Sequence, residues 1–213
     1  MEPVKRRPYD GSRRREQARL GREAILAAAR QRFLHEGYSV TTITSIAAAA
    51  DASPDTIYKT FGGKAGLLRS LCEDALRGSH PEPAEQRSDA MQAAEADPQA
   101  LLRGLGTLTT EIAPRIAPLL LLLAAASDTD RSLAQLRSEL DQARLTRMTR
   151  VAQNLATKTS LRPGVSAQDA AEIMWTYSAP ELYRLLVVDR GWSPERYGQF
   201  VGDALIDALL GPG

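Results

Sequence analysis

Residues 42–64 read TITSIAAAADASPDTIYKTFGGK, and this stretch predicts two short helices joined by a tight turn. Thr42 stands directly before apolar residues at helical spacing, so its hydroxyl can cap a first helix that ends near Ala50. Ser53 followed by Pro54 is a strong helix start, because a capping hydroxyl precedes a proline at the first helical position. The stretch therefore has the layout of a helix-turn-helix.

The second of these helices is predicted to run from Pro54 to Phe61, where Gly62 breaks it and Lys64 opens a further helix. This second helix is rich in small polar residues and is followed closely by the lysine. Such an arrangement can place a helix in the major groove of DNA.

A longer helix is predicted on the N-terminal side, from near Ser12 or Arg13 to about Glu36, and Gly37 ends it. Apolar residues recur along it at three- and four-residue steps: Leu20, Ala24, Ile25, Ala28, Ala29 and Phe33. Residues 1–12 show no such periodicity and carry several basic side chains. We expect them to form a flexible basic arm.

The rest of the chain also reads as helical, because no alternating stretch bounded by hairpin turns is present. The predicted fold is therefore all-α. Residues 78–86 are expected to form a loop, and further helices are expected at 87–95, 98–113, 115–126 and 129–157. A helix capped by Ser166 is expected to kink at Pro180, and Ser193 with Pro194 opens the final helix.

Charge is unevenly distributed along the chain. The protein has 27 basic and 26 acidic residues, yet residues 1–69 hold 13 and 7 of them, a net +6, and the remainder holds 14 and 19, a net −5. A basic N-terminal third on an acidic body is typical of a nucleic-acid reader with a separate second function. A chance tail of arginines gives the same balance, so charge alone leaves both readings open.

Cysteine usage and hydropathy favour a soluble, cytoplasmic protein. The single Cys72 excludes an internal disulfide and a cysteine zinc cluster, and it suits a reducing compartment. No signal peptide is visible behind the basic N-terminus. The longest apolar run, residues 116–126, includes Pro118 and is too short to span a bilayer. We expect no membrane segment, no metal and no cofactor.

At this point the sequence resembles the TetR family of bacterial transcriptional regulators over roughly residues 22–70. The matching positions are Gly37-Tyr38, Thr42-Ile43, Ile46-Ala47, Ser53, Thr56-Ile57-Tyr58, Phe61, Lys64 and Leu67-Leu68. Two positions depart from the family pattern. Asp51 stands where glycine is usual, and aspartate tolerates the positive φ expected there better than most residues. Ser45 stands where an acidic residue is common, which is expected to remove a local cap.

Several residues are expected to contact DNA phosphates. The resemblance implies this role for Tyr58 and Lys64. Thr42 and Ser53 lie at helix N-termini, where a hydroxyl and free N–H groups suit a phosphate, or where the hydroxyl only caps its helix. The arginines at 13–15 are expected to add backbone or minor-groove contacts, unless they form only a solvated charge run.

Sequence readout is expected from the exposed face of the predicted 54–61 helix, because bases are distinguished at major-groove edges. The side chains concerned are Asp55, Thr56, Lys59 and Thr60. Phosphate repels the carboxylate of Asp55, so this residue either accepts a hydrogen bond from a cytosine amine or points to solvent.

The resemblance also implies two domains: a DNA-binding domain over residues 13–77 and a helical ligand-binding and dimerisation domain over 78–213. The last two helices are expected to pair across a two-fold axis and form a homodimer. Met148, Trp175 and Tyr177 combine apolar surface with adaptable or polar ends, so they are expected to line an inducer pocket unless they belong to the core.

The predicted function is a transcriptional regulator, by family habit a repressor, which binds a palindromic operator in double-stranded DNA and is released by a small molecule. An enzyme is not predicted, because the chain has no GxGxxG, phosphate loop, HExxH or nucleophile elbow where chemistry would need one. The alternative is a helical interaction protein that retains the fold without specific DNA binding.

Overall fold

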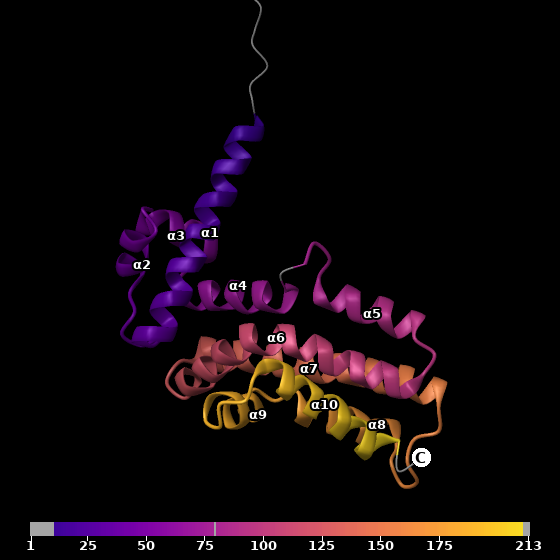
Figure 1. Ribbon diagram of the computed structural model, residues 1–213. Helices are drawn as coiled ribbons and strands as arrows, with labels where there is room; N and C mark the ends of the chain where they lie inside the picture. Colours follow the sequence, from indigo (N-terminus) through magenta and orange to yellow (C-terminus); the bar gives the residue numbers. More distant parts are fainter. Residues whose placement is uncertain (1–10, 79, 211–213) are drawn as a thin grey trace, which may run out of the picture. The chain divides into compact units, whose positions relative to one another are not determined.

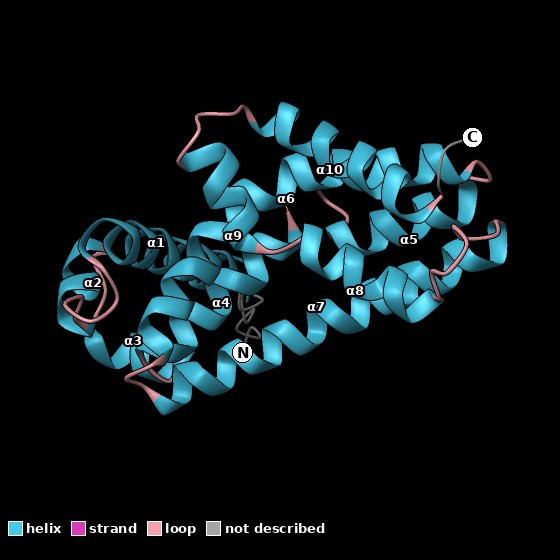
Figure 2. Cartoon of the chain, turned by 90° about the horizontal axis from the view of Figure 1, so that it is seen from below, coloured by secondary structure: helices cyan, strands magenta, loops and turns pink. Residues whose placement is uncertain are grey.

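The computed structural model describes residues 11–78 and 80–210, and every regular element in these ranges is helical (Figure 1). Figure 2 shows the same helices joined by loops, with no strand in the described ranges. The predicted all-α fold is therefore confirmed. The chain divides into two compact units, Met1–Leu68 and Arg69–Gly213. Most of the predicted basic arm, residues 1–10, lies outside the described residues.

The first unit holds α1 (Gly11–Glu36), α2 (Ile43–Ala49), α3 (Pro54–Phe61) and the start of α4 (Lys64–Arg77). The predicted bounds of α3 are confirmed, and α1 begins one residue before the predicted start. The side chains at its centre are at most 2% exposed: Ile25, Ala29, Phe33, Ile46, Ala47, Ile57, Leu67 and Leu68. Because they come from all four helices, each helix is fixed by apolar burial.

The second unit holds the remaining elements: the last part of α4, α5 (Ala84–Ala94), α6 (Pro98–Ser127), α7 (Arg131–Lys158), α8 (Ala167–Tyr177), α9 (Pro180–Tyr183), a π-helical turn (Arg184–Val188) and α10 (Pro194–Leu209). α6 packs against α7 and α10, and α7 also packs against α8. Among the described helices, α6 alone is long and apolar enough to cross a membrane, a property that core helices of soluble proteins share.

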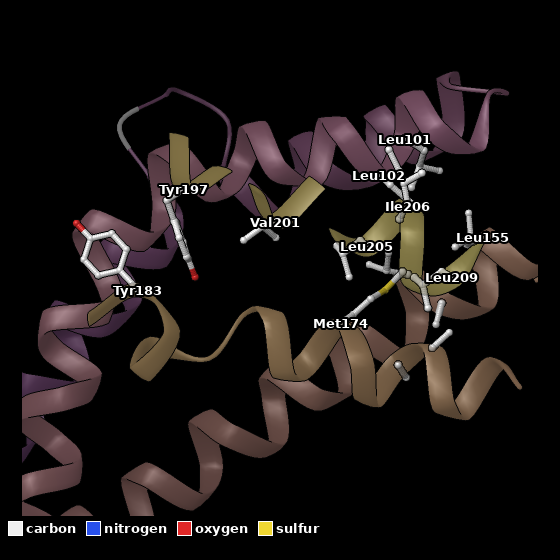
Figure 3. Packing of buried hydrophobic residues seen from close by; sticks show 14 of the residues in the cluster. Leu101, Leu102, Leu155, Met174, Tyr183, Tyr197, Val201, Leu205, Ile206 and Leu209 are labelled. Atoms are coloured by element: carbon white, nitrogen blue, oxygen red, sulfur yellow. The ribbon is translucent and has the colours of Figure 1, made fainter. Parts of the chain in front are cut away.

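The core of the second unit forms where α6, α7, α8 and α10 converge (Figure 3). Its central side chains are at most 4% exposed: Leu101, Leu102, Leu155, Met174, Val201, Leu205 and Leu209. At one end the rings of Tyr183 and Tyr197 meet edge to face, with centroids 5.5 Å apart. Burial raises the pKa of Tyr197 to about 12, so this phenol stays neutral in the core.

α6 is one continuous helix, whereas the sequence predicts two helices at 98–113 and 115–126. Pro114 and Pro118 lie inside it, and a proline in a helix interior costs about 3 kcal/mol. Four leucines of α6 are fully buried: Leu101, Leu102, Leu119 and Leu123. Since burial of one leucine is worth about 1.5–3 kcal/mol, packing on both sides of the prolines outweighs their cost and keeps the helix whole.

Three other boundaries differ from those predicted. α5 begins at Ala84, inside the segment 78–86 for which the sequence predicts a loop. α8 stops at Tyr177 and Pro180 opens α9, so the predicted kink is an interruption. Proline is tolerated there because its missing N–H would have no helical partner in a first turn. The compact units divide inside α4, whereas the sequence places the domain boundary after residue 77.

α10 and α6 approach each other closely at their backbones. This contact predicts that one added methyl group on α6 lowers the stability of the protein. A Cβ at Gly106 would collide with the backbone of Gly198 and Gly202, so Gly106→Ala is expected to lower the free energy of unfolding by about 1–3 kcal/mol. Gly21→Ala on α1 is the control, because a Cβ there meets nothing within 4 Å and gains about 1 kcal/mol of helix propensity. Urea unfolding followed by circular dichroism measures both, and equal midpoints would contradict the close contact.

Candidate nucleic-acid interface

α2 begins at a reciprocal cap formed by two hydroxyl side chains. The Thr42 hydroxyl accepts a hydrogen bond from the Ser45 backbone N–H at 3.0 Å, and the Ser45 hydroxyl accepts one from the Thr42 backbone N–H at 3.3 Å. This capping box satisfies two N–H groups that have no partner within the helix. The expectation that Ser45 removes a local cap is therefore wrong, because a serine hydroxyl closes the box in place of a carboxylate.

α3 is fixed at both ends by its own sequence. At its start the Ser53 hydroxyl accepts a hydrogen bond from the Thr56 backbone N–H at 3.1 Å, and Pro54 occupies the first turn. At its end Gly62 has φ 75°, and its N–H donates to the Tyr58 carbonyl at 2.9 Å. Glycine adopts this left-handed conformation without steric cost, so the helix stops at a defined residue.

The turn between α2 and α3 is tight although it lacks the usual glycine. Asp51 has φ 49° and is the one non-glycine residue with positive φ in the described ranges. The expectation of a positive φ at this position is confirmed. The Ala52 N–H donates to the Ala47 carbonyl at 2.9 Å and closes the turn. Aspartate adopts this region more readily than most residues, so the geometry of the turn is kept.

Most of the surface of α3 faces solvent. Of its eight residues, only Ile57 and Phe61 are buried. Tyr58 is 56% exposed, and Thr42 is exposed at the start of α2. The other predicted contacts are exposed as well: Ser53, Asp55, Thr56, Lys59 and Thr60. The structure therefore places seven of the eight predicted DNA contacts on the surface of α3 and the helix starts beside it.

Lys64 differs from the other predicted contacts. Its ammonium lies 2.6 Å from the Tyr38 carbonyl oxygen, 2.8 Å from that of Thr41 and 3.4 Å from that of Ser39. A lysine ammonium has three N–H donors, and these carbonyls take them up. A direct phosphate contact by Lys64 would have to replace these hydrogen bonds. In this structure the lysine ties the start of α4 to the loop between α1 and α2.

Tyr38 is a residue of the interface scaffold to which the sequence assigns no role. It is buried, its ring centroid lies 5.2 Å from that of Phe33, and the Lys64 ammonium lies 4.4 Å from the same ring. The available signal is its place directly after Gly37, the residue that ends α1. Tyr38 thus provides both a carbonyl and a ring face for the ammonium group.

Of the three residues predicted to line a ligand pocket, only Trp175 lies at a hollow. This hollow has a volume of about 520 Å³ and is bordered by the end of α6, by α7 and by α8, with Arg137, Asp141 and Leu145 among its lining residues. Met148 and Tyr177 pack against the apolar core of the second unit. The structure does not bring the three predicted residues together around one cavity.

Arg144 is the residue beside this hollow that sequence reasoning misses. Its guanidinium lies 4.5 Å from the centre of the Trp175 ring and donates to the Trp175 carbonyl at 2.7 Å. The buried indole N–H of Trp175 has no hydrogen-bond partner among the described residues. A buried donor without an acceptor costs about 1–3 kcal/mol, so this N–H is a local cost to the stability of the second unit.

The sequence model of the family described as bacterial regulatory proteins, tetR family, matches residues 25–71. Over these residues the chain is similar to the TetR family. The matched residues contain α2, α3 and their caps, so the TetR-family segment coincides with the surface described above. No curated protein sequence matches the chain.

The fold of the chain is similar to several solved structures. A SmeT–triclosan complex is 22% identical, with a TM-score of 0.69, and the match covers 91% of this chain and 93% of that one. NalD, the secondary repressor of the MexAB-OprM multidrug efflux pump in Pseudomonas aeruginosa, is 21% identical, with a TM-score of 0.67 and coverage of 91% and 98%. FadR, a fatty acid degradation regulator from Bacillus halodurans, is 18% identical, with a TM-score of 0.69 and coverage of 87% and 94%. These likenesses show a shared fold over nearly the whole chain.

The hydrogen bonds of Lys64 predict that its replacement affects stability. Lys64→Met leaves carbonyl oxygens without their donor, so it is expected to lower the free energy of unfolding by about 1–3 kcal/mol. Lys59→Met, at an exposed position on α3, is the matched control and is expected to change stability by no more than about 0.5 kcal/mol. Thermal and urea unfolding measure both variants. Equal stability of the two variants would show that the carbonyl contacts contribute nothing to the fold.

Proposed function

We propose that this protein is a transcriptional repressor that binds a palindromic DNA operator through α3 and leaves it when a small molecule binds the second unit. The observation that carries the proposal is the exposure of α3, a helix fixed at both ends with only two of its eight residues buried. A structural helix in a small domain is expected to bury one whole face. A short helix that presents its remaining surface to solvent suits insertion into the major groove.

Phosphate contacts are proposed for Thr42, Ser53 and Tyr58. The phenol of Tyr58 is exposed and can donate to a phosphate oxygen. The oxygens of Thr42 and Ser53 already accept backbone hydrogen bonds, and the Thr42 hydroxyl has its own hydrogen to donate. The Ser53 hydroxyl lies 2.9 Å from the Thr56 hydroxyl, so it can donate to a phosphate when Thr56 is the donor of that pair. These contacts would fix the position of α3 on the duplex, while a capping role alone remains the alternative for the two hydroxyls.

Base readout is proposed for the four other exposed side chains of α3: Asp55, Thr56, Lys59 and Thr60. Asp55 and Lys59 are one helical turn apart, so the helix offers an acceptor and a donor on the same side. An acceptor of this kind suits a cytosine amine, and a lysine suits the acceptor atoms of guanine. This pairing favours operator sequences with guanine or cytosine in the contacted half-site.

A homodimer through the last helices is part of the proposal. Two large apolar side chains after α9 are exposed, Leu185 at 48% and Val188 at 62%. A second copy of the chain would remove this apolar surface from water. A two-fold dimer presents two copies of α3, which is why the proposed operator is a palindrome with half-sites about 34 Å apart.

The small-molecule ligand is proposed to bind at the hollow beside Trp175. The SmeT structure is a complex with triclosan, and another similar structure, a transcriptional regulator from Saccharomonospora viridis, is a complex with choline. For this chain the support is the hollow itself, with Trp175 in its lining and the Arg144 guanidinium packed against the Trp175 ring. The protein is proposed to act in the cytoplasm without enzymatic activity.

Selection of bound duplexes from a random pool tests the proposed function at about 150 mM salt, near physiological ionic strength. A recovered palindrome is the expected result, because a dimeric reader keeps its sequence preference at this salt concentration. Binding that shows no preferred sequence and disappears steeply with salt would instead indicate the alternative, a helical interaction protein that binds DNA only as a basic surface.

Two variants separate the proposed roles on α3. Tyr58→Phe removes a phosphate donor, so it is expected to weaken binding to all sequences alike. Asp55→Ala is expected to change the preferred base at one operator position, since each base contact is worth about 1–3 kcal/mol of discrimination. Repeating the selection with each variant measures both effects. An unaltered preferred site for Asp55→Ala would remove this residue from the readout.

A further inference from the structure

The N-terminal part of α1 extends beyond the rest of the first unit. Residues 12–21 are all exposed, and the first buried side chain of the helix is Ile25. Arg22 contacts another helix, because its guanidinium lies 4.9 Å from the centre of the Phe61 ring at the end of α3. Figure 1 shows these first turns of α1 extending past α2 and α3. From its start at Gly11 to Gly21 the helix has eleven residues, which at about 1.5 Å each make an extension roughly 16 Å long.

Salt bridges within the helix stabilise this extension in the absence of packing. Arg19 lies 2.6 Å from a carboxylate oxygen of Glu16 and 2.5 Å from one of Glu23. The hydrogen bond from Arg19 lowers the pKa of Glu16 below its ordinary value, so this carboxylate stays ionised. Pairs at these spacings stabilise a helix that has no buried face. The extension is therefore a solvated helix and not an extended arm.

The same pairing leaves positive charge at the outer end of the extension. Residues 12–22 contain five arginines and one glutamate, a net +4, and the carboxylates of Glu16 and Glu23 engage Arg19. Arg14 and Arg15 form no ion pair within the described ranges 11–78 and 80–210. The charge that remains near the tip is thus turned to solvent.

We infer that the outer end of α1 is a second DNA-contacting surface, in which Arg14 and Arg15 bind phosphates of the duplex beyond the groove that α3 occupies. The inference rests on the proposed DNA binding. It follows from charge complementarity and from the position of the extension, which leaves the first unit beside the end of α3. At about 3.4 Å per base pair, a reach of roughly 16 Å spans about five base pairs of flanking DNA.

The helical state of these residues decides which part of the duplex they contact. The sequence leaves both backbone and minor-groove contacts open for the arginines at 13–15. An α-helix with its side chains is about 10–12 Å wide, whereas the minor groove is about 6 Å wide. The helix body therefore cannot enter the minor groove, which favours phosphates as the partners of its arginines. Such contacts raise affinity and salt dependence without changing the preferred sequence.

The test compares the double variant Arg14→Gln/Arg15→Gln with a matched control, Arg103→Gln/Arg131→Gln, which removes two exposed arginines from α6 and α7. Full-length protein is titrated with the selected operator and with the same operator carrying about ten flanking base pairs on each side, roughly twice the reach of the extension. Binding is measured between about 50 and 200 mM salt, and circular dichroism checks that both variants keep the fold.

Loss of two phosphate contacts per subunit is expected to lower the slope of log affinity against log salt by about 4 for a dimer. Over this salt range that corresponds to about a 100-fold smaller loss of affinity. The wild type and the control gain affinity from the flanks, and the variant does not. Equal slopes for the variant and the control would overturn the inference, even if the operator is bound specifically. If no operator is recovered, the proposed function fails, and the same slopes measured on a duplex of arbitrary sequence still decide whether the extension binds phosphate.

Discussion

Only two buried side chains attach α3 to the rest of the first unit, and the position of the proposed DNA-facing surface depends on this attachment. Ile57 and Phe61 are its only apolar anchors, and a helix of eight residues is unstable by itself in water. The caps at Ser53 and Gly62 supply what packing does not, since an N-cap hydroxyl alone is worth about 1 kcal/mol. Because these devices use backbone groups, the other six side chains of α3 can face outward.

Hydrogen bonds to backbone groups also hold the helices of the first unit together, through the side chain of Lys64. Its ammonium meets carbonyls from the loop after α1, so a single side chain joins the start of α4 to a segment more than twenty residues away in sequence. The charge is stabilised there by peptide dipoles and by the ring of Tyr38. An uncharged replacement would lose both interactions. Lys64 therefore has a structural role in the first unit, whether or not it also contacts DNA.

The sequence predicts those features that depend on neighbours in the chain. The bounds of α3 follow from Ser53, Pro54 and Gly62, and the positive φ of Asp51 follows from the turn that it must form. Features that depend on distant residues are missed. Local rules break α6 at Pro114 because they do not include leucines buried on both sides, and helical periodicity cannot tell a core residue such as Met148 from one at a hollow such as Trp175.

The uneven distribution of charge along the chain restricts how the molecule can approach DNA. Residues 1–69 carry a net +6 and the remainder a net −5, so the field of the duplex attracts one part of the chain and repels the other. Within the described part of the first unit, the basic side chains lie chiefly on α1, beside the end of α3. Orientation is thus favoured before any base is contacted, at separations near the Debye length of about 8 Å at physiological salt. In the proposed function, the short-range contacts of α3 would then select the register along the groove.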